Sequence, residues 1–333
     1  MKKKIVFLTD ANEKVGFGHL NRTNILAQLF YENKYDCFIF GIKKIHIKKN
    51  YFKKILESSP IKGKSINLSL IEKALNTKNF FLIIDTFRIN LAIQKKLLKA
   101  NVKWLQFDNF QNNKRLYADI VVNANPLIKK IDYKVRSYSK KKQIFLTGKK
   151  YLLIRDEFKK RYKINSKFVL ICSGGGRKDN NFIDTILKTI LKIYKFEKIV
   201  IILDKNDPRK KKISKINTGT NKVKIVKKTN NISKYFAQSK IVYLSGGTIL
   251  IESLFYDLKR FVCSIATNQV QNCLSWEKLK FVNYLGDLSE KKINNKNILK
   301  KIKDKKHDHN IQVLNRQYIN GKKLIYNNIV KLF

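Results

Sequence analysis

A glycine turn and a histidine stand close together near the start of the chain, in the run Gly16-Phe17-Gly18-His19. The run follows a strand-like apolar segment, Lys4 to Thr9, and precedes an apolar stripe typical of a helix. Glycines let the backbone turn sharply and approach a ligand, and His19 falls in the first turn of the expected helix. Because a helix N-terminus disfavours imidazolium, we expect a neutral His19 that accepts a proton near pH 7. His19 is therefore a candidate general base, with a packing role as the alternative.

Two further glycine turns lie in the second half of the chain, and each follows an apolar run and precedes a helix-like stretch. They are Ser173-Gly174-Gly175-Gly176 and Ser245-Gly246-Gly247-Thr248. Such turns present backbone N–H groups to phosphate oxygens, so a diphosphate is the ligand that we expect. Neither turn has P-loop spacing or the full dinucleotide fingerprint, which disfavours ATPase and dehydrogenase functions. Two purely structural turns are the alternative.

Polar residues next to the second of these turns are candidate nucleotide ligands. Glu252 lies one helical turn beyond Thr248, which directs its carboxylate back toward the glycines, where it could accept hydrogen bonds from ribose hydroxyls. A carboxylate among leucines and isoleucines is costly to bury without a partner. Asn268 and Gln269 follow the next expected strand, and their amides could bind phosphate or sugar.

Acidic residues follow three expected strands in the first half, namely Asp10, Asp85 and Asp108. They could orient His19 or bind sugar hydroxyls, or instead cap neighbouring helices. Arg22 lies one turn after His19, and we expect it to pair with Asp10 or with the substrate, with a purely structural salt bridge as the alternative. Because strands of an open α/β sheet end at its ligand crevice, we include these four residues and the turn glycines Gly16 and Gly18 in the sugar side of the site.

The elements that position these residues follow an alternating pattern of short apolar runs and helix-like stretches, which is typical of parallel sheets covered by helices. The pattern restarts after a basic segment at 136–142. We therefore expect an α/β protein with an N-terminal Rossmann-like domain over residues 1–150 and a second Rossmann-like domain over 151–289. A basic, helical C-terminal segment follows at 290–333, and a polar, lysine-rich connection is expected at 204–222.

Composition limits the class of protein. A chain of 333 residues with 44% hydrophobic residues suits two globular domains. No apolar run is long enough to span a membrane, and the N-terminus does not resemble a signal peptide. The four widely spaced cysteines indicate reduced thiols, with no disulfide framework and no metal site. We expect a cytoplasmic protein.

The formal charge of +48 raises the question of nucleic-acid binding. The excess is mostly lysine, spread from end to end in a chain that is also rich in Asn, Ile, Phe and Tyr, as in proteins encoded by AT-rich genes. The sequence contains no zinc finger, no RNP-type aromatic motif and no pattern for a recognition-helix dimer. We therefore expect no specific nucleic-acid partner.

Taken together, the motifs resemble one family of polysaccharide biosynthesis, the UDP-2,4-diacetamido-2,4,6-trideoxy-β-L-altropyranose hydrolases of pseudaminic (nonulosonic) acid biosynthesis, which are related to MurG-like glycosyltransferases. The resemblance spans residues 4 to 285. It rests on the motifs at residues 16–19 with Arg22, 107–108, 119 with 123, 153–158, 245–248 with Glu252, and 268–269.

The resemblance implies a GT-B architecture, in which two Rossmann-like domains face each other across a cleft. It implies hydrolysis of the anomeric C–O bond to release UDP, with a UDP-sugar as substrate and without a cofactor or metal. His19 matches the catalytic histidine of the family, Asn268 and Gln269 match an amide pair near the diphosphate, and Glu252 matches a glutamate on the nucleotide side.

Two departures from the family pattern concern the substrate. Phe87 stands where the family has a tyrosine, which removes a hydroxyl that could touch the sugar, and the turn at residues 175–179 is one residue longer. The exact sugar therefore stays open. Two other functions also stay open: a GT-B glycosyltransferase that uses a UDP-sugar, and a non-catalytic protein that binds nucleotide sugars.

Overall fold

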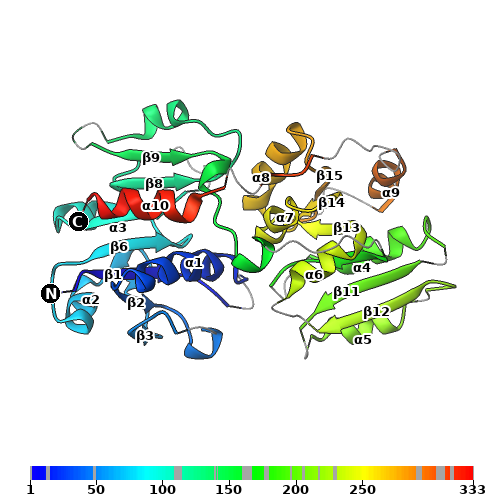
Figure 1. Cartoon of the computed structure of the whole chain (residues 1–333), viewed down its shortest axis with the longest axis horizontal. Coiled ribbons are helices and arrows are strands. Elements are labelled where there is room, and N and C mark those ends of the chain that lie inside the picture. The colour runs from blue at the N-terminus through cyan, green and yellow to red at the C-terminus, as the bar shows by residue number, and fades with distance from the viewer. Residues whose placement is uncertain are drawn as a thin grey trace. The chain divides into compact units, whose positions relative to one another are not determined.

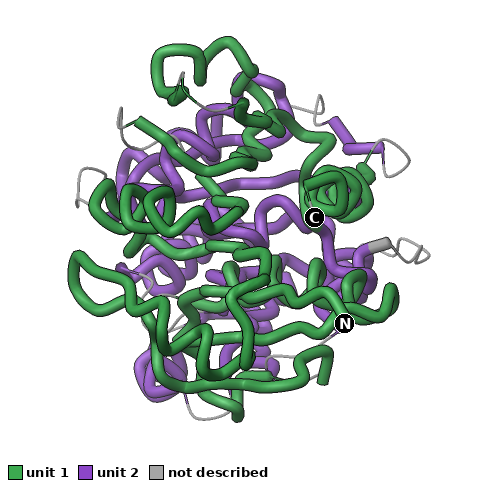
Figure 2. The backbone as a smooth tube through the Cα atoms, turned by 90° about the vertical axis from the view of Figure 1, so that its left-hand side faces the viewer, with its two compact units in different colours: residues 1–153, 317–333 green, residues 154–316 purple. Residues whose placement is uncertain are grey.

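The computed structural model of the chain describes most of its residues. The described ranges are 2–12, 16–47, 50–108, 115–138, 140, 142–159, 167–175, 180–195, 197–204, 207–216, 218–227, 231–289, 295–304, 312–315 and 319–332. The chain divides into two compact units (Figure 2). The first unit contains residues 1–153 and 317–333, and the second contains residues 154–316.

The first unit is built on a sheet of seven parallel strands in the order β3-β2-β1-β6-β7-β8-β9. Apolar residues alternate between the two faces of the sheet, so Ile5 and Phe7 of β1 join one core cluster while Val6 and Leu8 join another. Both faces are buried, which explains the continuous apolar runs of the sequence. The strands are β1 (Lys4–Thr9), β2 (Asp36–Phe40), β3 (Lys54–Leu56), β6 (Phe81–Asp85), β7 (Lys103–Phe107), β8 (Ile120–Asn123) and β9 (Ile144–Thr147).

Helices cover both faces of this sheet (Figure 1). Helices α1 (Gly18–Glu32) and α10 (Gly321–Val330) pack against each other on one face, where the rings of Phe30 and Tyr326 lie 5.0 Å apart. Helices α2 (Leu68–Leu75) and α3 (Leu91–Lys99) cover the other face. A small hairpin of β4 (Ile61–Lys62) and β5 (Ser65–Ile66) precedes α2, and the short 3₁₀ helices are η1 (Lys44–His46), η2 (Lys130–Arg136) and η3 (Lys149–Tyr151).

The second unit has a sheet of six parallel strands in the order β12-β11-β10-β13-β14-β15. The strands are β10 (Phe168–Cys172), β11 (Lys198–Leu203), β12 (Lys222–Lys227), β13 (Ser239–Ser245), β14 (Lys259–Ser264) and β15 (Asn283–Asp287). The helices are η4 (Asp156–Lys159), α4 (Phe182–Ile190), α5 (Arg209–Ser214), α6 (Ile232–Ala237), α7 (Thr248–Ser253), α8 (Thr267–Lys278) and α9 (Asn295–Asp304). Helices α4, α5 and α9 pack on the face that carries Val169 and Ile171.

The strand order reverses once in each sheet, which gives each sheet a topological switch point. In the first sheet β1 lies between β2 and β6, and in the second sheet β10 lies between β11 and β13. Successive connections therefore leave in opposite directions from β1 and from β10. Open α/β sheets bind ligands at such switch points, beyond the carboxyl ends of the strands.

The structure corrects one sequence prediction about the second unit and divides the helices of the C-terminal segment between the two units. The prediction of a polar connection at 204–222 is wrong in part, because helix α5 forms there and buries its residue Ile213. The sequence did not reveal this helix, because a single apolar residue among lysines gives no recognisable helical period. Helices form in the C-terminal segment as expected, but they are divided between the units. Helix α9 belongs to the second unit and α10 to the first, where Figure 1 shows it in red among blue, cyan and green elements.

Candidate functional site

His19 lies at the switch point of the first sheet. Thr9 at the end of β1 pairs in register with Asp85 at the end of β6, and α1 begins just beyond β1. Gly16 adopts a φ of 87°, a conformation that side chains other than glycine rarely take, and donates a 2.8 Å hydrogen bond from its amide to the carbonyl of Asn12. The turn places His19 in the first turn of α1, as the sequence predicts.

The imidazole of His19 is buried, and charged groups of both signs act on it. Its Nδ1 lies 3.7 Å from Oδ1 of Asp85 and has no hydrogen-bond partner in the part of the chain that the structure describes. Burial is the main cause that lowers the pKa of His19, and the Arg22 cation adds to it. Asp85 and Asp10 oppose this shift without reversing it. The imidazole is therefore neutral near pH 7.

Arg22 pairs with Asp85 and not with Asp10. Its Nε donates to Oδ2 of Asp85 at 2.8 Å and its Nη2 donates to Oδ1 at 2.7 Å, so both carboxylate oxygens are engaged. Asp85 is 3% exposed. Burial alone would raise the pKa of Asp85, but Arg22 and His19 outweigh burial and hold that pKa below its ordinary value. The Arg22 guanidinium also lies 5.4 Å from the centre of the Phe107 ring.

Asp10 anchors the loop that follows β6. Its two carboxylate oxygens accept hydrogen bonds from Thr86 Oγ1 and from the Arg88 guanidinium, and the Arg88 amide donates to Thr86 Oγ1 at 3.0 Å. Phe87 lies between these two anchored residues. Its ring meets the His19 ring edge to face at 4.6 Å and is 52% exposed. The structure thus brings Asp10, Phe87 and Asp85 together around His19.

Asp108 belongs to a different polar cluster, at the end of β7. It accepts hydrogen bonds of 2.7 Å from the Tyr133 hydroxyl and from Nη1 of Arg136, both on η2. The Tyr133 hydroxyl accepts in turn from Nδ2 of Asn123 at 2.9 Å. Burial and Asp108 raise the pKa of Tyr133, so its hydroxyl stays a donor. Asp108 therefore holds η2 against the sheet edge.

The two glycine turns of the second unit flank the switch point of its sheet. One follows β10 and the other follows β13, the neighbouring strand. The Ser245 hydroxyl donates a 2.9 Å hydrogen bond to the carbonyl of Ser173, which joins the two turns. Gly174 has a φ of 86°, and Gly175 follows it. Gly176, also a predicted site residue, lies outside the described residues.

Helix α8 packs directly on the second turn. A Cβ at Gly246 would lie 2.3 Å from Sγ of Cys273 and 3.1 Å from Cβ of Gln269, so only glycine fits there. Nδ2 of Asn272 donates to the Gly246 carbonyl at 3.0 Å. The side chain of Gln269 faces the turn too, because the Cβ position of Gly247 is 3.5 Å from its Nε2.

The predicted amide pair lies in the first turn of α8, which the sequence analysis did not identify as a helix. Oε1 of Gln269 accepts a 3.0 Å hydrogen bond from the Ile265 amide, which leaves its Nε2 as the donor on the side of Gly247. Asn268 is half-buried beside it. Nδ2 of Asn180, just before α4, donates to the Ile265 carbonyl at 2.7 Å and ties the starts of the two helices together. The Nε2 of Gln269 is thus an amide donor next to the glycine turn.

Glu252 of α7 is buried against Arg155. Nε and Nη2 of Arg155 donate to its two oxygens at 2.6 and 2.7 Å, and Nη1 of Arg155 lies 2.5 Å from Oε1 of Glu157. Burial raises the pKa of Glu252, and Arg155 works in the opposite direction. The Arg155 guanidinium also lies 4.8 Å from the centre of the Phe158 ring. Both Glu252 oxygens that were expected to meet ribose hydroxyls therefore already accept from Arg155.

The sequence analysis did not identify three residues that bind predicted site residues: Arg155, which binds Glu252, and Thr86 and Arg88, which bind Asp10. Arg155 stands inside the run 153–158 that carries the resemblance, and its combination of one arginine with two neighbouring acids was the available signal. Thr86 and Arg88 flank Phe87 in sequence, but their common partner Asp10 is 76 and 78 residues away. No local pattern reveals a pairing over such a distance.

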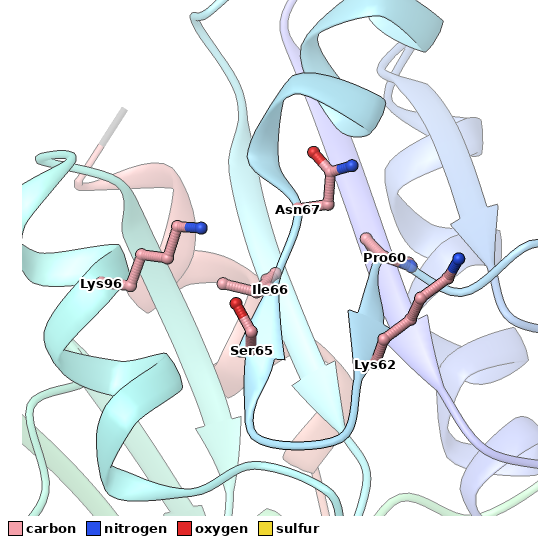
Figure 3. Close-up of a pocket in the computed structure, with 6 residues that line it drawn as sticks. All are labelled: Pro60, Lys62, Ser65, Ile66, Asn67 and Lys96. Atoms are coloured by element: carbon pink, nitrogen blue, oxygen red, sulfur yellow. The ribbon is translucent and has the colours of Figure 1, made fainter.

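A separate pocket lies between the β4–β5 hairpin and α3 in the first unit (Figure 3). Lys62 of β4 borders it on one side and Lys96 of α3 on the other, and its remaining lining residues are Pro60, Ser65, Ile66 and Asn67. None of the predicted site residues lines it. Among the described residues, no group of three or more His, Cys, Asp or Glu side chains is arranged to hold a metal ion, and no helix is long and apolar enough to cross a membrane.

Comparison with curated proteins gives two relatives, and no family model matches the chain. An uncharacterized protein of Methanocaldococcus jannaschii is 27% identical over 272 residues, which are 76% of this chain and 54% of that protein. The chain thus spans about half the length of that relative. The UDP-2,4-diacetamido-2,4,6-trideoxy-β-L-altropyranose hydrolase of Campylobacter jejuni is 26% identical over 259 residues, 75% of this chain and 88% of that enzyme. The resemblance drawn from the sequence motifs is confirmed.

Solved structures share the fold over the whole chain. S. aureus MnaA, in a co-structure with UDP, superposes with a TM-score of 0.64 at 14% identity and covers 100% of this chain and 97% of that one. MurG of Acinetobacter baumannii gives a TM-score of 0.60 at 10% identity and covers 99% of both chains. The predicted α/β fold of the GT-B type, with two Rossmann-like domains, is confirmed.

Proposed function

We propose that this chain hydrolyses a UDP-linked 2,4-diacetamido-2,4,6-trideoxyhexose to UDP and the free sugar, a reaction of pseudaminic acid biosynthesis. The named relative from Campylobacter jejuni supports the reaction and the substrate class. The observation that carries the proposal is the neutral, buried His19 at the switch point of the first sheet, beside the carboxylate of Asp85. We assign sugar recognition to residues of the first unit and nucleotide recognition to residues of the second.

In the proposed step His19 is the general base. One imidazole nitrogen takes a proton from water, and the water oxygen forms a bond to the anomeric carbon. The bond between that carbon and the diphosphate oxygen breaks, and its electron pair leaves with UDP, so the configuration at the anomeric carbon inverts. A positioned base contributes about 10²- to 10⁴-fold to such a step, which suits a leaving group that is already good.

The nucleotide side of the proposed site uses the joined glycine turns of the second unit. The turn at Gly174 and the residues Gly247 and Thr248 of the second turn lie at the carboxyl ends of β10 and β13, where a diphosphate gains from a close backbone approach. The amide of Gly246 itself donates to the Cys263 carbonyl at 2.9 Å, so we assign the N–H groups for the diphosphate in the second turn to Gly247 and Thr248. Nε2 of Gln269 adds an amide donor beside Gly247. These neutral donors stabilise the charge that develops on the leaving diphosphate. The role of Glu252 in this proposal is to hold Arg155 and α7 beneath the turn.

A second candidate function is transfer of the sugar to an acceptor other than water. It is favoured by one observation: the structures with the same fold include MurG and a glycosyltransferase of kitacinnamycin. A protein that binds nucleotide sugars without turnover is a third. Acceptor-dependent release of UDP would identify the transferase, and tight UDP binding with no release would identify the binding protein.

The test is UDP release from UDP-2,4-diacetamido-2,4,6-trideoxy-β-L-altropyranose, with no acceptor and with a chelator present. Wild type and His19→Asn are measured side by side at equal concentration. Release by the wild type alone supports a hydrolase that uses His19. Release by neither protein, with UDP still bound, rejects the hydrolase for this sugar and moves the transferase to first place.

A further inference from the structure

We propose that Arg22 and Asp85 are positioning residues for His19: Arg22 clamps Asp85, and Asp85 holds the imidazole with its Nδ1–H toward the sheet and its Nε2 toward the reacting water. The kinetic consequences of this inference rest on the proposed function. The predicted tautomer and pKa of His19 do not depend on it. In this proposal Arg22 has a role in orienting His19, whereas the sequence analysis expected Arg22 to pair with Asp10 or with the substrate, or to form a structural salt bridge.

The contacts define a chain of three groups. Arg22 donates two hydrogen bonds to Asp85, at 2.8 and 2.7 Å, and Oδ1 of Asp85 faces Nδ1 of His19 at 3.7 Å. The second distance is longer than a hydrogen bond, and such contacts commonly tighten when substrate binds. Nδ1 is buried and makes no hydrogen bond among the residues described here, so a proton on Nδ1 meets the acceptors of Asp85, whose carboxylate lies 3.7 Å away and whose backbone carbonyl also acts on the ring. Nε2 is then the nitrogen with the free lone pair.

Arg22 is needed because an unpaired Asp85 carboxylate would favour protonation of His19, and a protonated His19 cannot act as a base. Asp85 is 3% exposed, and a buried carboxylate without a cation would attract a proton onto His19 or take one itself. Arg22 compensates that charge and leaves the Asp85 oxygens in a fixed position. The result is a carboxylate that can orient the imidazole while the imidazole stays neutral.

The other groups that face His19 do not replace this pair. Asp10, at the end of β1, is engaged by Thr86 and Arg88, and the Phe87 ring covers a side of the imidazole without offering a hydrogen bond to Nδ1. The charged groups that act on His19 are therefore Asp85, Arg22 and Asp10, from β6, α1 and the end of β1. Only Asp85 lies within 4 Å of Nδ1 as an ion-pair partner in the described chain.

The experiment is NMR of the ¹⁵N-labelled histidine imidazoles in the full chain, without substrate. The His19 signals are identified by their loss in His19→Asn, and wild type is compared with Arg22→Gln and Asp85→Asn. We expect a neutral ring with the proton on Nδ1 in wild type. Arg22→Gln should raise the pKa of His19, and Asp85→Asn should lower it and abolish the preference for Nδ1–H. Lys53→Gln is the matched control, because it removes an exposed ion pair of the same unit, with Asp36, and should shift neither property.

An unchanged His19 pKa and tautomer in folded Arg22→Gln would overturn the inference, and so would a wild-type ring protonated on Nε2. If Arg22→Gln does not fold, Asp85→Asn, which keeps the shape of the side chain, decides by the same criteria. The NMR measurements need no turnover. Failure of the proposed hydrolysis would therefore be seen in the UDP-release assay of the wild type, and failure of the positioning role would be seen in the NMR comparison.

Kinetics then separate a positioning Arg22 from a substrate ligand. If hydrolysis is observed, loss of the orienting carboxylate in Asp85→Asn should lower kcat by about 10²-fold, as expected for a misplaced catalytic group, with KM little changed. Arg22→Gln should act on kcat in the same direction. An Arg22→Gln variant whose KM rises while kcat and the acid limb of its pH profile stay as in wild type would assign Arg22 to the substrate and overturn the inference.

Discussion

The hydroxyl of Ser245 donates a 2.9 Å hydrogen bond to the carbonyl of Ser173, across the boundary between two neighbouring strands of the second sheet. This bond connects turns that are 72 residues apart in sequence. It fixes the spacing of the two sets of backbone N–H groups that we propose for the diphosphate. A ligand that needs both turns finds them already in place, which lowers the cost of ordering them on binding.

His19→Asn should lower kcat by about 10²- to 10⁴-fold and leave KM little changed, because the substitution removes a base that acts only in the chemical step. The measurement is steady-state UDP release, with circular dichroism to show that the variant is folded. A variant that keeps more than half of the wild-type activity would exclude His19 as the base.

Activity should rise with pH along an acid limb whose midpoint lies below 6.5, the ordinary value for histidine, because burial lowers the pKa of His19 and the neutral ring is the active form. The same shift affects stability. The contribution of His19 is present above pH 6.5 and is lost as the pH falls through its folded pKa, because the unfolded chain takes up the proton first. Profiles of kcat/KM, which reports the free protein, and of urea midpoints against pH check both limbs. A midpoint of kcat/KM above 6.5 would contradict the prediction.

Gly246→Ala should destabilise the second unit by about 1–3 kcal/mol, since the new methyl group would lie 2.3 Å from the buried Cys273 sulfur and must displace α8. Gly247→Ala is the control. The nearest atom to its Cβ position is 3.5 Å away, so its urea midpoint should match that of wild type. Equal midpoints for the two variants would show that α8 does not pack as closely as the structure indicates.

Glu252→Gln should cost about 1.5–3 kcal/mol of stability, the range for hydrogen bonds to charged groups, because Arg155 loses a charged partner and keeps Glu157. UDP affinity of the folded variant should stay close to that of wild type. Urea unfolding and calorimetric titration with UDP measure the two effects separately. Weak UDP binding without loss of stability would instead support contact between Glu252 and the ribose.

Phe87→Ala should raise KM by about 3- to 10-fold, since an aromatic contact contributes roughly 0.5–1.5 kcal/mol. Phe87→Tyr restores the hydroxyl usual in the resembled family and keeps the ring against His19. Its KM for the trideoxy sugar should stay within about twofold of wild type if the ring, not a hydroxyl, makes the contact. A large gain in kcat/KM for Phe87→Tyr would show that this chain is adapted to a different sugar.

The sequence predicted best those features that depend on nearby residues. Continuous apolar runs such as Ile5 to Leu8 predicted parallel strands that are buried on both faces. Polar residues at strand ends predicted that Asp10 and Asp85 lie at one sheet edge, and the glycine turn after β1 predicted His19 beside them. Partners were harder to predict. Arg22 meets Asp85 63 residues away, and Arg155 meets Glu252 97 residues away, so these pairs exist only once the sheets have brought distant segments together.

The placement of α10 could not be predicted for a related reason. Its apolar residues Ile325 and Ile329 show that one face is buried, but the same pattern in α9, at Ile298 and Ile302, serves the other unit. The close fit of the start of α10 against the backbone of the first unit is specific to that unit. The start of α10 lies so close to the backbone of Tyr151 and Leu152 that a Cβ at Gly321 would be 2.3 Å from the Leu152 carbonyl oxygen.

This return of the C-terminal helix sets an order of events during synthesis. Residues 154–316, the whole second unit, leave the ribosome before α10 does, although the first unit began earlier. The face of α1 that receives Ile325 and Ile329 therefore stays uncovered while the second unit is completed. Because domains fold as their residues emerge, the unit made first is the one finished last, and a ribosome that stops before residue 317 releases a chain with an exposed apolar face.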